Sequence, residues 1–403
     1  MEEWKEYKLG DVCSRLRSGK SIKADFISNT GKYPVIGGNG IRGYADTSNF
    51  EGQAAVIGRQ GAYCGNVRFF EGEAYMTEHA VVAVGSELAD TRFLACLLSL
   101  MHLGNLSAQS AQPGISVQTL SKQSILLPSV VYQKKVSAIV KSLDDKIEIN
   151  RRINENLEQQ AQDLFKSWFV DFEPFKDGEF VESELGMIPK GWRVGRFEDI
   201  IESTISGDWG KEKKEGNYSH KVACIRGCDF QDIKNGLRGN TPERYILEKN
   251  FQAKHFKDKD MLVEISGGTQ TVSTGRVCPV SQMLIDKFNQ DIVCTNFCRV
   301  VRPVAQYAAY LYYSWLFKYD KKVMFGYENG TSGIKNFRIK DFISMEPVII
   351  PNDEALNKFQ MIIDTMQVQI QTRGSESSRL AELRDTLLPK LMSGELKVDE
   401  INL

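Results

Sequence analysis

The stretch 132–171 constrains the fold most, because it contains neither proline nor glycine and nothing in it forces a helix to break. Apolar residues recur along it alternately every three and four positions, which is the a/d pattern of a coiled coil. The resulting seam comprises Val136, Val140, Leu143, Ile147, Asn150, Asn154, Leu157, Ala161, Leu164 and Trp168. At about 1.5 Å per residue the helix would be roughly 60 Å long, so we expect it to need a partner along its length. An ordinary long surface helix is the alternative.

A second stretch, 354–394, has a similar seam formed by Phe359, Ile363, Met366, Ile370, Leu380, Leu387 and Leu391. Gly374 and the serines after it predict a bend or a loosening in the middle of this helix. Polar residues also occupy seam positions (Asn150, Asn154, Arg373 and Ser377), and such residues usually fix register and partner choice. We therefore predict that the two helices pair within the chain as an antiparallel coiled coil.

The chain is also an internal duplication, in which each half runs through the same order of segments. Each half opens on a tryptophan (Trp4 and Trp192), continues through a Ser-Gly pair and short strands split by glycine, and reaches a Thr-led strand followed by a compact helix. A polar glycine-bearing loop, a short strand ending in proline and the long helix close each half. The Thr-led strands are 77–84 and 295–301, the compact helices 90–101 and 305–317, and the closing loops 110–116 and 329–335. The predicted fold class is α+β, with two similar globular domains alternating with two long paired helices in a pseudo-two-fold arrangement.

Composition limits the class of protein. With 403 residues, 42% of them hydrophobic and 26% charged, the chain predicts a globular protein of more than one domain. No run approaches the length of a membrane span, the start is not typical of a secretory signal, and the 8 scattered cysteines fit a reducing compartment, so we expect a cytoplasmic protein without membrane contact. The net charge of −1 argues against coating nucleic acid by bulk charge but permits local basic patches.

Three motifs carry a family resemblance: LFKSWFVDFEPF at 164–175, SELGMIPKGW at 183–192 and LRDTLLPKLMSGEL at 383–396. With them, nearly the whole chain resembles the DNA-specificity (S) subunit of a type I restriction–modification system. The resemblance implies a non-catalytic subunit that recognises a split, asymmetric site in double-stranded DNA. It also implies two methyltransferase subunits and restriction/translocase subunits as partners, with S-adenosylmethionine, ATP and Mg bound by those partners and no cofactor on this chain.

On this basis we predict six segments. They are a first target recognition domain (1–128), a first long spacer helix (129–171), a linker (172–190), a second target recognition domain (191–351), a second long spacer helix (352–395) and a C-terminal tail (396–403). One turn of B-DNA is about 34–36 Å, so a rod of this length suggests a spacer of roughly five to eight base pairs between the half-sites.

Base readout should come from glycine-rich loops, since Arg or Lys can pair with guanine and Asn or Gln with adenine in the major groove. In the first domain the predicted DNA-binding residues are Ser18, Lys20, Asn39, Arg42, Arg59, Gln60, Gln109, Ser110 and Gln112. In the second they are Trp209, Lys211, Lys213, Lys214, Arg226, Thr269, Gln270, Thr331, Ser332 and Lys335. The basic run 210–216 suits phosphate contact better than base readout. Each of these could instead be an ordinary polar loop residue.

For the partner subunits we predict docking on the long helices through Phe165, Trp168, Phe169, Leu387, Leu388 and Leu391. The alternative for these residues is the coiled-coil seam itself, on which Trp168, Leu387 and Leu391 lie. We also expect no metal site. Cys224, Cys228, Cys294 and Cys298 have spacings that zinc permits, but they lie in apolar runs, which favours core packing.

Catalytic signatures are missing from the sequence. An amino-methyltransferase of DNA needs an Asn/Asp-Pro-Pro-aromatic tetrapeptide, and the chain has no Pro-Pro. A P-loop is absent and the histidines form no metal-binding pair. Two other functions remain open at this point: a helix-rod adaptor whose globular units bind protein rather than DNA, and an independent enzyme with an unrecognised site.

Overall fold

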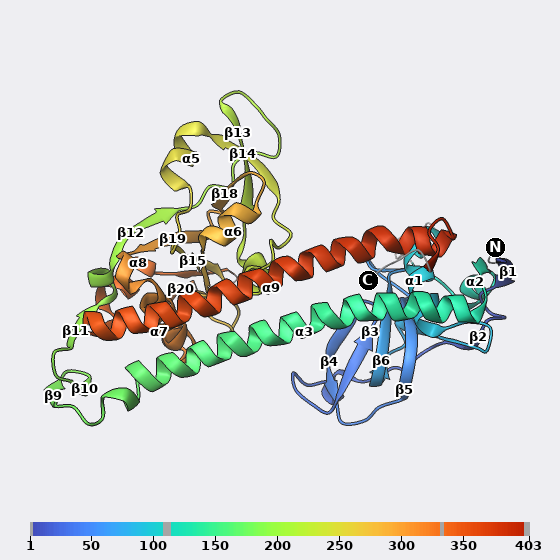
Figure 1. The fold of residues 1–403 in the computed structure, drawn as a ribbon, viewed down its shortest axis with the longest axis horizontal. Coiled ribbons are helices and arrows are strands. Elements are labelled where there is room, and N and C mark those ends of the chain that lie inside the picture. Colours follow the sequence, from blue (N-terminus) through green and yellow to red (C-terminus); the bar gives the residue numbers. More distant parts are fainter. Residues whose placement is uncertain (1–2, 108–113, 331–333, 399–403) are drawn as a thin grey trace. The chain divides into compact units, whose positions relative to one another are not determined.

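The structure is a computed structural model that describes residues 3–107, 114–330 and 334–398. It divides into two compact units, unit 1 (Met1–Lys146 with Leu380–Leu403) and unit 2 (Ile147–Arg379). Two long helices, α3 (Val130–Phe169) and α9 (Asp353–Ser393), contribute residues to both units (Figure 1). Among the described residues, no helix is apolar over a length sufficient to cross a membrane.

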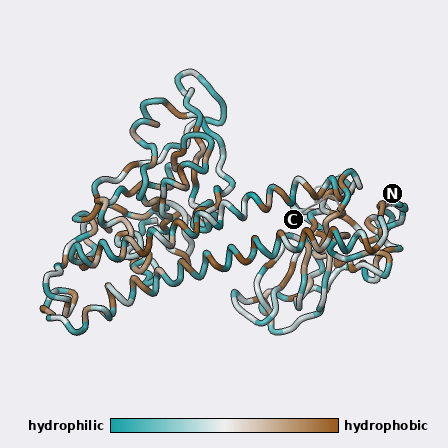
Figure 2. The backbone as a smooth tube through the Cα atoms, viewed as in Figure 1, coloured by the Kyte–Doolittle hydropathy of each residue, from teal (hydrophilic) through white to brown (hydrophobic). Residues whose placement is uncertain are grey.

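Both long helices begin and end within two residues of their predicted bounds. Hydrophobic and hydrophilic residues alternate along them (Figure 2), and the predicted seam is buried or partly buried in each unit. Val136, Val140 and Leu143 are buried in unit 1, and Asn150 and Ala161 in unit 2. The three–four spacing therefore identified the inward face of α3, and the alternative of a plain surface helix is wrong.

The two helices are antiparallel, as predicted. In unit 1, Nη1 of Arg384 donates to Oδ1 of Asp144 over 2.8 Å. In unit 2, Nδ2 of Asn150 donates to Oγ of Ser377 over 3.3 Å. The later residue of α3 thus meets the earlier residue of α9. Asn150 and Ser377 are both nearly fully buried, so this polar pair satisfies seam positions that would otherwise be unpaired.

At Gly374, where the sequence predicted a bend or a loosening, α9 continues as one helix. Gly374 is buried, and a Cβ atom placed on it would lie within 3.0 Å of the backbone of Gly236. Gly236 has φ of +75°, a conformation that favours glycine, and a Cβ there would meet the carbonyl oxygen of Ile370 at 2.7 Å. Glycine occurs in mid-helix here because a loop of unit 2 lies directly against the helix backbone.

Unit 1 contains a sheet whose strand order is β2-β7-β5-β6-β3-β4 and a separate antiparallel pair, β1 with β8. Its strands are β1 (Lys5–Lys8), β2 (Cys13–Ser18), β3 (Tyr33–Gly37), β4 (Gly40–Ala45), β5 (Phe50–Gly58), β6 (Val67–Met76), β7 (Ala80–Gly85) and β8 (Ser124–Leu127), and its short helices are α1 (Thr91–Leu100) and α2 (Val117–Ser121). Helix α1 buries Phe93, Leu94 and Leu98 against one face of the sheet. Its N-cap Asp90 accepts a hydrogen bond from the backbone N–H of Phe93.

Unit 2 contains a sheet of order β12-β19-β15-β17, a smaller sheet β14-β13-β18, a small sheet β16-β21-β20, a β9–β10 hairpin and the pair β11 with β22. Its strands are β9 (Phe180–Ser183), β10 (Gly186–Pro189), β11 (Arg193–Arg196), β12 (Ile201–Ser206), β13 (Tyr218–Ile225), β14 (Glu243–Leu247), β15 (Met261–Glu264), β16 (Ser266–Gly267), β17 (Val277–Pro279), β18 (Asp291–Cys294), β19 (Cys298–Pro303), β20 (Glu328–Asn329), β21 (Lys335–Phe337) and β22 (Pro347–Ile350). Its short helices are α4 (Phe230–Lys234), α5 (Glu248–Lys254), α6 (Gln282–Lys287), α7 (Ala308–Asp320) and α8 (Ile339–Met345).

The strand orders confirm the internal duplication. The order β2-β7-β5-β6 in unit 1 matches β12-β19-β15-β17 in unit 2, and the pair β1–β8 matches β11–β22. The helix after the Thr-led strand is α1 in one unit and α7 in the other. The units differ in one strand: the end of β6 pairs in parallel with β3, whereas in unit 2 a separate strand, β18, takes the place of that end and pairs in parallel with β13, the counterpart of β3.

Candidate DNA-recognition surface

A tight turn before the Thr-led strand organises the loops of unit 1. We call it the Thr turn, residues 77–80 in unit 1. The N–H of Thr77 donates to the carbonyl oxygen of Ile36 over 2.9 Å, and that of Ala80 to Thr77 over 3.0 Å. The N–H of Arg59 donates to the carbonyl oxygen of His79 over 2.9 Å. These hydrogen bonds hold the end of β3 and the start of the loop after β5 against the Thr turn.

Unit 2 has the same turn at residues 295–298, with the same hydrogen bonds. The N–H of Thr295 donates to Ile225 over 3.0 Å, that of Cys298 to Thr295 over 2.9 Å, and that of Ile265 to Phe297 over 2.8 Å. The two turns share only the threonine in sequence, yet their backbones form the same hydrogen bonds.

The Ser-Gly pairs of the sequence lie against these turns. The N–H of Lys20 donates to Met76 over 2.9 Å, and that of Asp208 to Cys294 over 2.8 Å. A Cβ atom at Gly19 or Gly207 would lie within 3.0 Å of the backbone at the neighbouring Thr turn. Glycine is needed at both positions because two backbones meet there.

The predicted residues of unit 1 converge on the Thr turn. Gly38, beside Asn39, lies close to both the carbonyl oxygen of His79 and Gly58. Nη2 of Arg68 donates to Oδ1 of Asn39 over 3.1 Å. We define the loop end of unit 1 as 18–20, 37–42, 59–66 and the Thr turn; it includes the predicted residues Ser18, Lys20, Asn39, Arg42, Arg59 and Gln60. Gln109, Ser110 and Gln112 lie outside the described residues.

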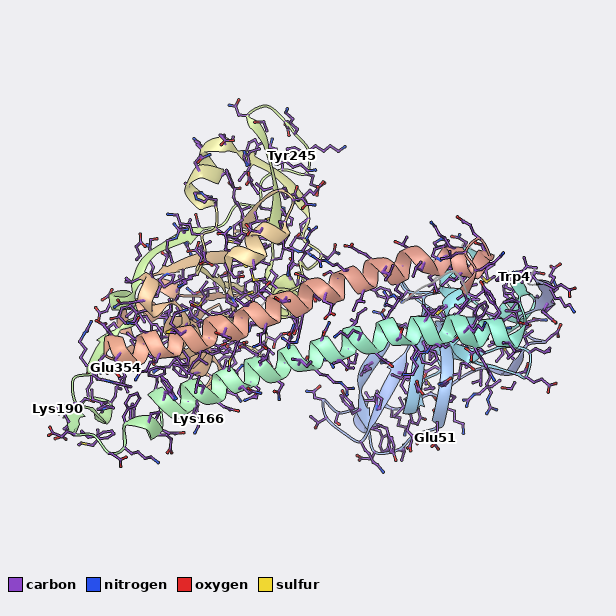
Figure 3. The ribbon with its side chains drawn as sticks, in the orientation of Figure 1. Trp4, Glu51, Lys166, Lys190, Tyr245 and Glu354 are labelled. Atoms are coloured by element: carbon purple, nitrogen blue, oxygen red, sulfur yellow. The ribbon has the colours of Figure 1, made fainter. Side chains whose placement is uncertain are left out.

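The two ends of unit 1 differ in the charge of their exposed side chains. At the start of β5, Glu51 is paired directly with Glu73 of β6, and Glu71 is also exposed (Figure 3 labels Glu51). The loop end at the other end of β5 carries Lys20, Arg42 and Arg59, with Arg68 close by on β6, and one carboxylate, Glu78. Exposed cations attract phosphates, so the loop end is the candidate face for DNA in unit 1.

Three of the predicted cations of unit 2 are held in ion pairs. Arg226 pairs with Asp229, which is nearly fully buried, through Nη2 and Oδ1 at 3.0 Å, and this hydrogen bond raises the pKa of Arg226. Lys335 pairs with Glu328 at 2.9 Å and Lys211 with Glu215 at 2.8 Å. These side chains are partly satisfied within the chain and are less available to DNA than those of unit 1.

Of the other predicted residues of unit 2, some contact the chain itself and others are exposed. Arg244 stacks over Trp209, with its guanidinium carbon 3.7 Å from the ring centroid, so one face of this ring is covered by the chain itself. The hydroxyl of Thr269 accepts from the N–H of Val272 over 3.0 Å and stabilises its own turn. Lys213, Lys214 and Gln270 are exposed. Thr331 and Ser332 lie outside the described residues.

Comparison with known proteins places this geometry in a family. A family model for the type I restriction modification DNA specificity domain matches residues 1–159. The type I restriction enzyme MjaIX specificity subunit of Methanocaldococcus jannaschii is 30% identical over 308 residues, which cover 74% of this chain and 67% of that protein. The chain belongs to the specificity subunits of type I restriction–modification systems.

Two more similarities extend over nearly the whole chain. The HindI specificity subunit of Haemophilus influenzae is 24% identical over 98% of this chain and 100% of its own length. The crystal structure of the S subunit from M. genitalium has a TM-score of 0.56 at 15% identity, over 97% of this chain and 96% of that one, which shows a common fold. The prediction of a non-catalytic DNA-specificity subunit is confirmed, and the family removes the protein-adaptor and independent-enzyme alternatives.

Sequence reasoning did not single out the Thr turn, which lies among the predicted residues. The side chain of Phe297 is 58% exposed, and that of His79 is 40% exposed at the matching position. Thr77 is fully buried, yet its hydroxyl, like that of Ser18, has no hydrogen-bond partner in the described chain. The signal was present, because a threonine opens the same strand in both halves.

The predicted docking residues lie largely in the chain's own cores. Phe165, Phe169 and Leu391 are buried, while Trp168 and the neighbouring leucines Leu387 and Leu388 are partly buried. Phe169 packs edge-to-face on Phe359 of α9, with ring centroids 5.0 Å apart, inside unit 2. A partner could reach Phe165, Phe169 or Leu391 only by repacking these cores, so we do not retain those three as docking residues.

Of the four cysteines whose spacing zinc permits, three fit core packing. Cys224, Cys294 and Cys298 are buried, and burial raises the pKa of the Cys224 and Cys298 thiols to about 12, which disfavours the thiolate that zinc needs. Cys228 is exposed, contrary to the interpretation as a core residue. Within the described residues, no group of three or more His, Cys, Asp and Glu side chains is arranged to hold a metal.

Proposed function

We propose that each unit recognises one half of a split DNA site through the loops around its Thr turn. The observation that carries this proposal is the identical hydrogen-bonded turn in both units, surrounded by different exposed side chains. The shared backbone places the loops in the same way in both units, and the side chains on those loops determine which bases are recognised. Because the two sets of side chains differ, the two half-sites differ and the whole site is asymmetric.

The long helices set the distance between the half-sites in this proposal. Both α3 and α9 continue as helix through the boundary between the two units. A helical connection transmits a fixed spacing, whereas a flexible linker would permit many spacings. We propose a spacer of roughly five to eight base pairs, comparable to part of one 34–36 Å turn of B-DNA.

Two methyltransferase subunits are proposed to dock on the outward faces of the helices, with restriction/translocase subunits joining them. Asn150 and Asn154 face inward, whereas their neighbours Ile149 and Ile153 are 50% and 36% exposed and lie one turn apart. S-adenosylmethionine, ATP and Mg would be bound by those partners. Replacing both isoleucines by glutamate should abolish co-purification of the methyltransferase while circular dichroism of the chain is unchanged. Retention of the partner by the folded double variant would exclude this docking face.

The function is tested by mapping methylated adenine across the genome of cells that express the methyltransferase partner with and without this chain. We expect one split motif with a single spacer length, present only with the chain. Methylation that does not depend on the chain, or a continuous motif, would contradict the proposal.

A further inference from the structure

Phe297 and His79 occupy equivalent places at the two loop ends, and neither side chain is needed to form the turn. In both turns the residue contributes its carbonyl oxygen, which accepts from Ile265 in unit 2 and from Arg59 in unit 1. A histidine at one position and a phenylalanine at the other support the same backbone. The choice of side chain is therefore free to serve recognition.

The turn holds Phe297 rigidly in an exposed position. The N–H of Phe297 donates to the hydroxyl of Thr295 over 3.1 Å, and Thr295 is itself buried. Within the described part of the chain, the Phe297 ring makes no aromatic or cation–π contact, although more than half of the side chain is exposed. A single exposed apolar residue is common, but here it is fixed beside Ile265, at the start of the segment that carries the exposed Gln270.

An aromatic ring without a hydrogen-bonding group contacts DNA through apolar groups on base edges or by stacking on base faces. The thymine C5-methyl is the apolar group on base edges in the major groove, and phenylalanine is one of the side chains that contact it. The fixed turn reduces the entropy lost when such a contact forms. We propose that Phe297 is a specificity-determining residue of unit 2 that contacts a thymine methyl group in its half-site, an inference that rests on the proposed recognition by the loop ends.

His79 provides the matched comparison in unit 1. Its imidazole can donate or accept a hydrogen bond, and Nε2 lies 3.4 Å from Oε1 of Glu78. The same place in the fold thus serves a polar contact in one half-site and an apolar contact in the other.

The test uses the full chain in complex with its methyltransferase subunits and duplexes built on the motif found by methylation mapping. Each thymine of the half-site assigned to unit 2 is replaced in turn by deoxyuridine, which removes only the methyl group, and binding is measured by fluorescence anisotropy. We expect one replacement to weaken wild-type binding about four-fold, the effect of one buried methyl group. Phe297→Ala should bind more weakly and be insensitive to that replacement, while His79→Ala keeps the full sensitivity.

Phe297→Leu keeps an apolar side chain and should retain part of the sensitivity, so the proposal does not depend on one variant alone. The proposal is overturned if no deoxyuridine weakens wild-type binding, or if Phe297→Ala keeps the wild-type response. Failure of the proposed function would give a different result. In that case the wild-type complex would bind the motif and a scrambled duplex equally well.

Discussion

Units 1 and 2 share a strand order and a hydrogen-bonded Thr turn, but they use their charged residues differently. In the described chain, Lys20, Arg42 and Arg59 of unit 1 form no ion pair, whereas Arg226 and Lys335 of unit 2 are paired with carboxylates. Unit 1 is therefore suited to charged contacts with DNA. Unit 2 is suited to neutral contacts, with the exposed Lys213 and Lys214 left for phosphate. One backbone can thus support two chemistries of recognition.

The units also differ in how they pack on the long helices. In unit 1 the buried Gln133 of α3 accepts from the N–H of Asp90 over 2.8 Å and donates to the carbonyl oxygens of Leu88 and Pro128 over 3.1 and 3.0 Å. In unit 2 the loop at Gly236 lies directly against Gly374 of α9. A side-chain network tolerates small shifts, whereas contact between two backbones does not.

The largest expected effect tests that backbone contact. Gly374→Ala places a methyl group against the backbone of Gly236, and overpacking of this kind costs about 3 kcal/mol. The loss should appear in chemical denaturation as destabilisation of unit 2. Gly326→Ala is the matched control, because a Cβ there meets nothing within 4 Å and should leave stability unchanged. Equal stability of the two variants would contradict the close approach.

A smaller effect is expected from Arg226→Ala. The substitution leaves the buried carboxylate of Asp229 without its guanidinium partner, and a lost hydrogen bond to a charged group costs about 2 kcal/mol. The free energy of unfolding should fall, while the salt dependence of DNA binding stays near that of the wild type. A normal stability combined with a weaker salt dependence would show that Arg226 contacts phosphate instead.

Arg59→Ala should give the opposite pattern. Arg59 has no ion pair in the described chain, so stability should change by less than about 0.5 kcal/mol. If Arg59 contacts phosphate, the slope of log affinity against log salt should fall by about one. Anisotropy titrations at several salt concentrations measure this slope, and an unchanged slope and affinity would remove Arg59 from the interface.

The smallest effect concerns Lys287, which packs in unit 2 beside the same glycine contact. Its ammonium donates to the carbonyl oxygen of Gly236 and to Oε1 of Gln371, and burial lowers its pKa to about 8. Between pH 8 and the ordinary value of 10.5, the unfolded chain binds this proton and the folded chain does not, so the contribution of Lys287 to stability should rise with pH in this range. Relative to Lys287→Met the rise should be below about 1 kcal/mol because the group is partly exposed. Parallel stability–pH curves for the two proteins would contradict the lowered pKa.

Local spacing made the long helices predictable, since Val136 and Ile363 needed only the three–four pattern to be assigned to the inward face. The close approach at Gly374 was not predicted because it depends on Gly236, more than a hundred residues away in sequence. The carboxylate partners of Arg226 and Lys335 were not predicted, since a paired cation and a free one look alike in a polar loop. Phe165 and Phe169 were assigned to a partner because the sequence does not show which aromatic residues the chain's own core uses.

The most direct test of the account is to replace residues 1–128 by the matching segment of another specificity subunit and to map methylated adenine in cells expressing the hybrid with its methyltransferase. The account predicts that one half of the motif changes, while the other half and the spacer stay the same. A change in both halves, or in neither, would contradict recognition of one half-site by each unit.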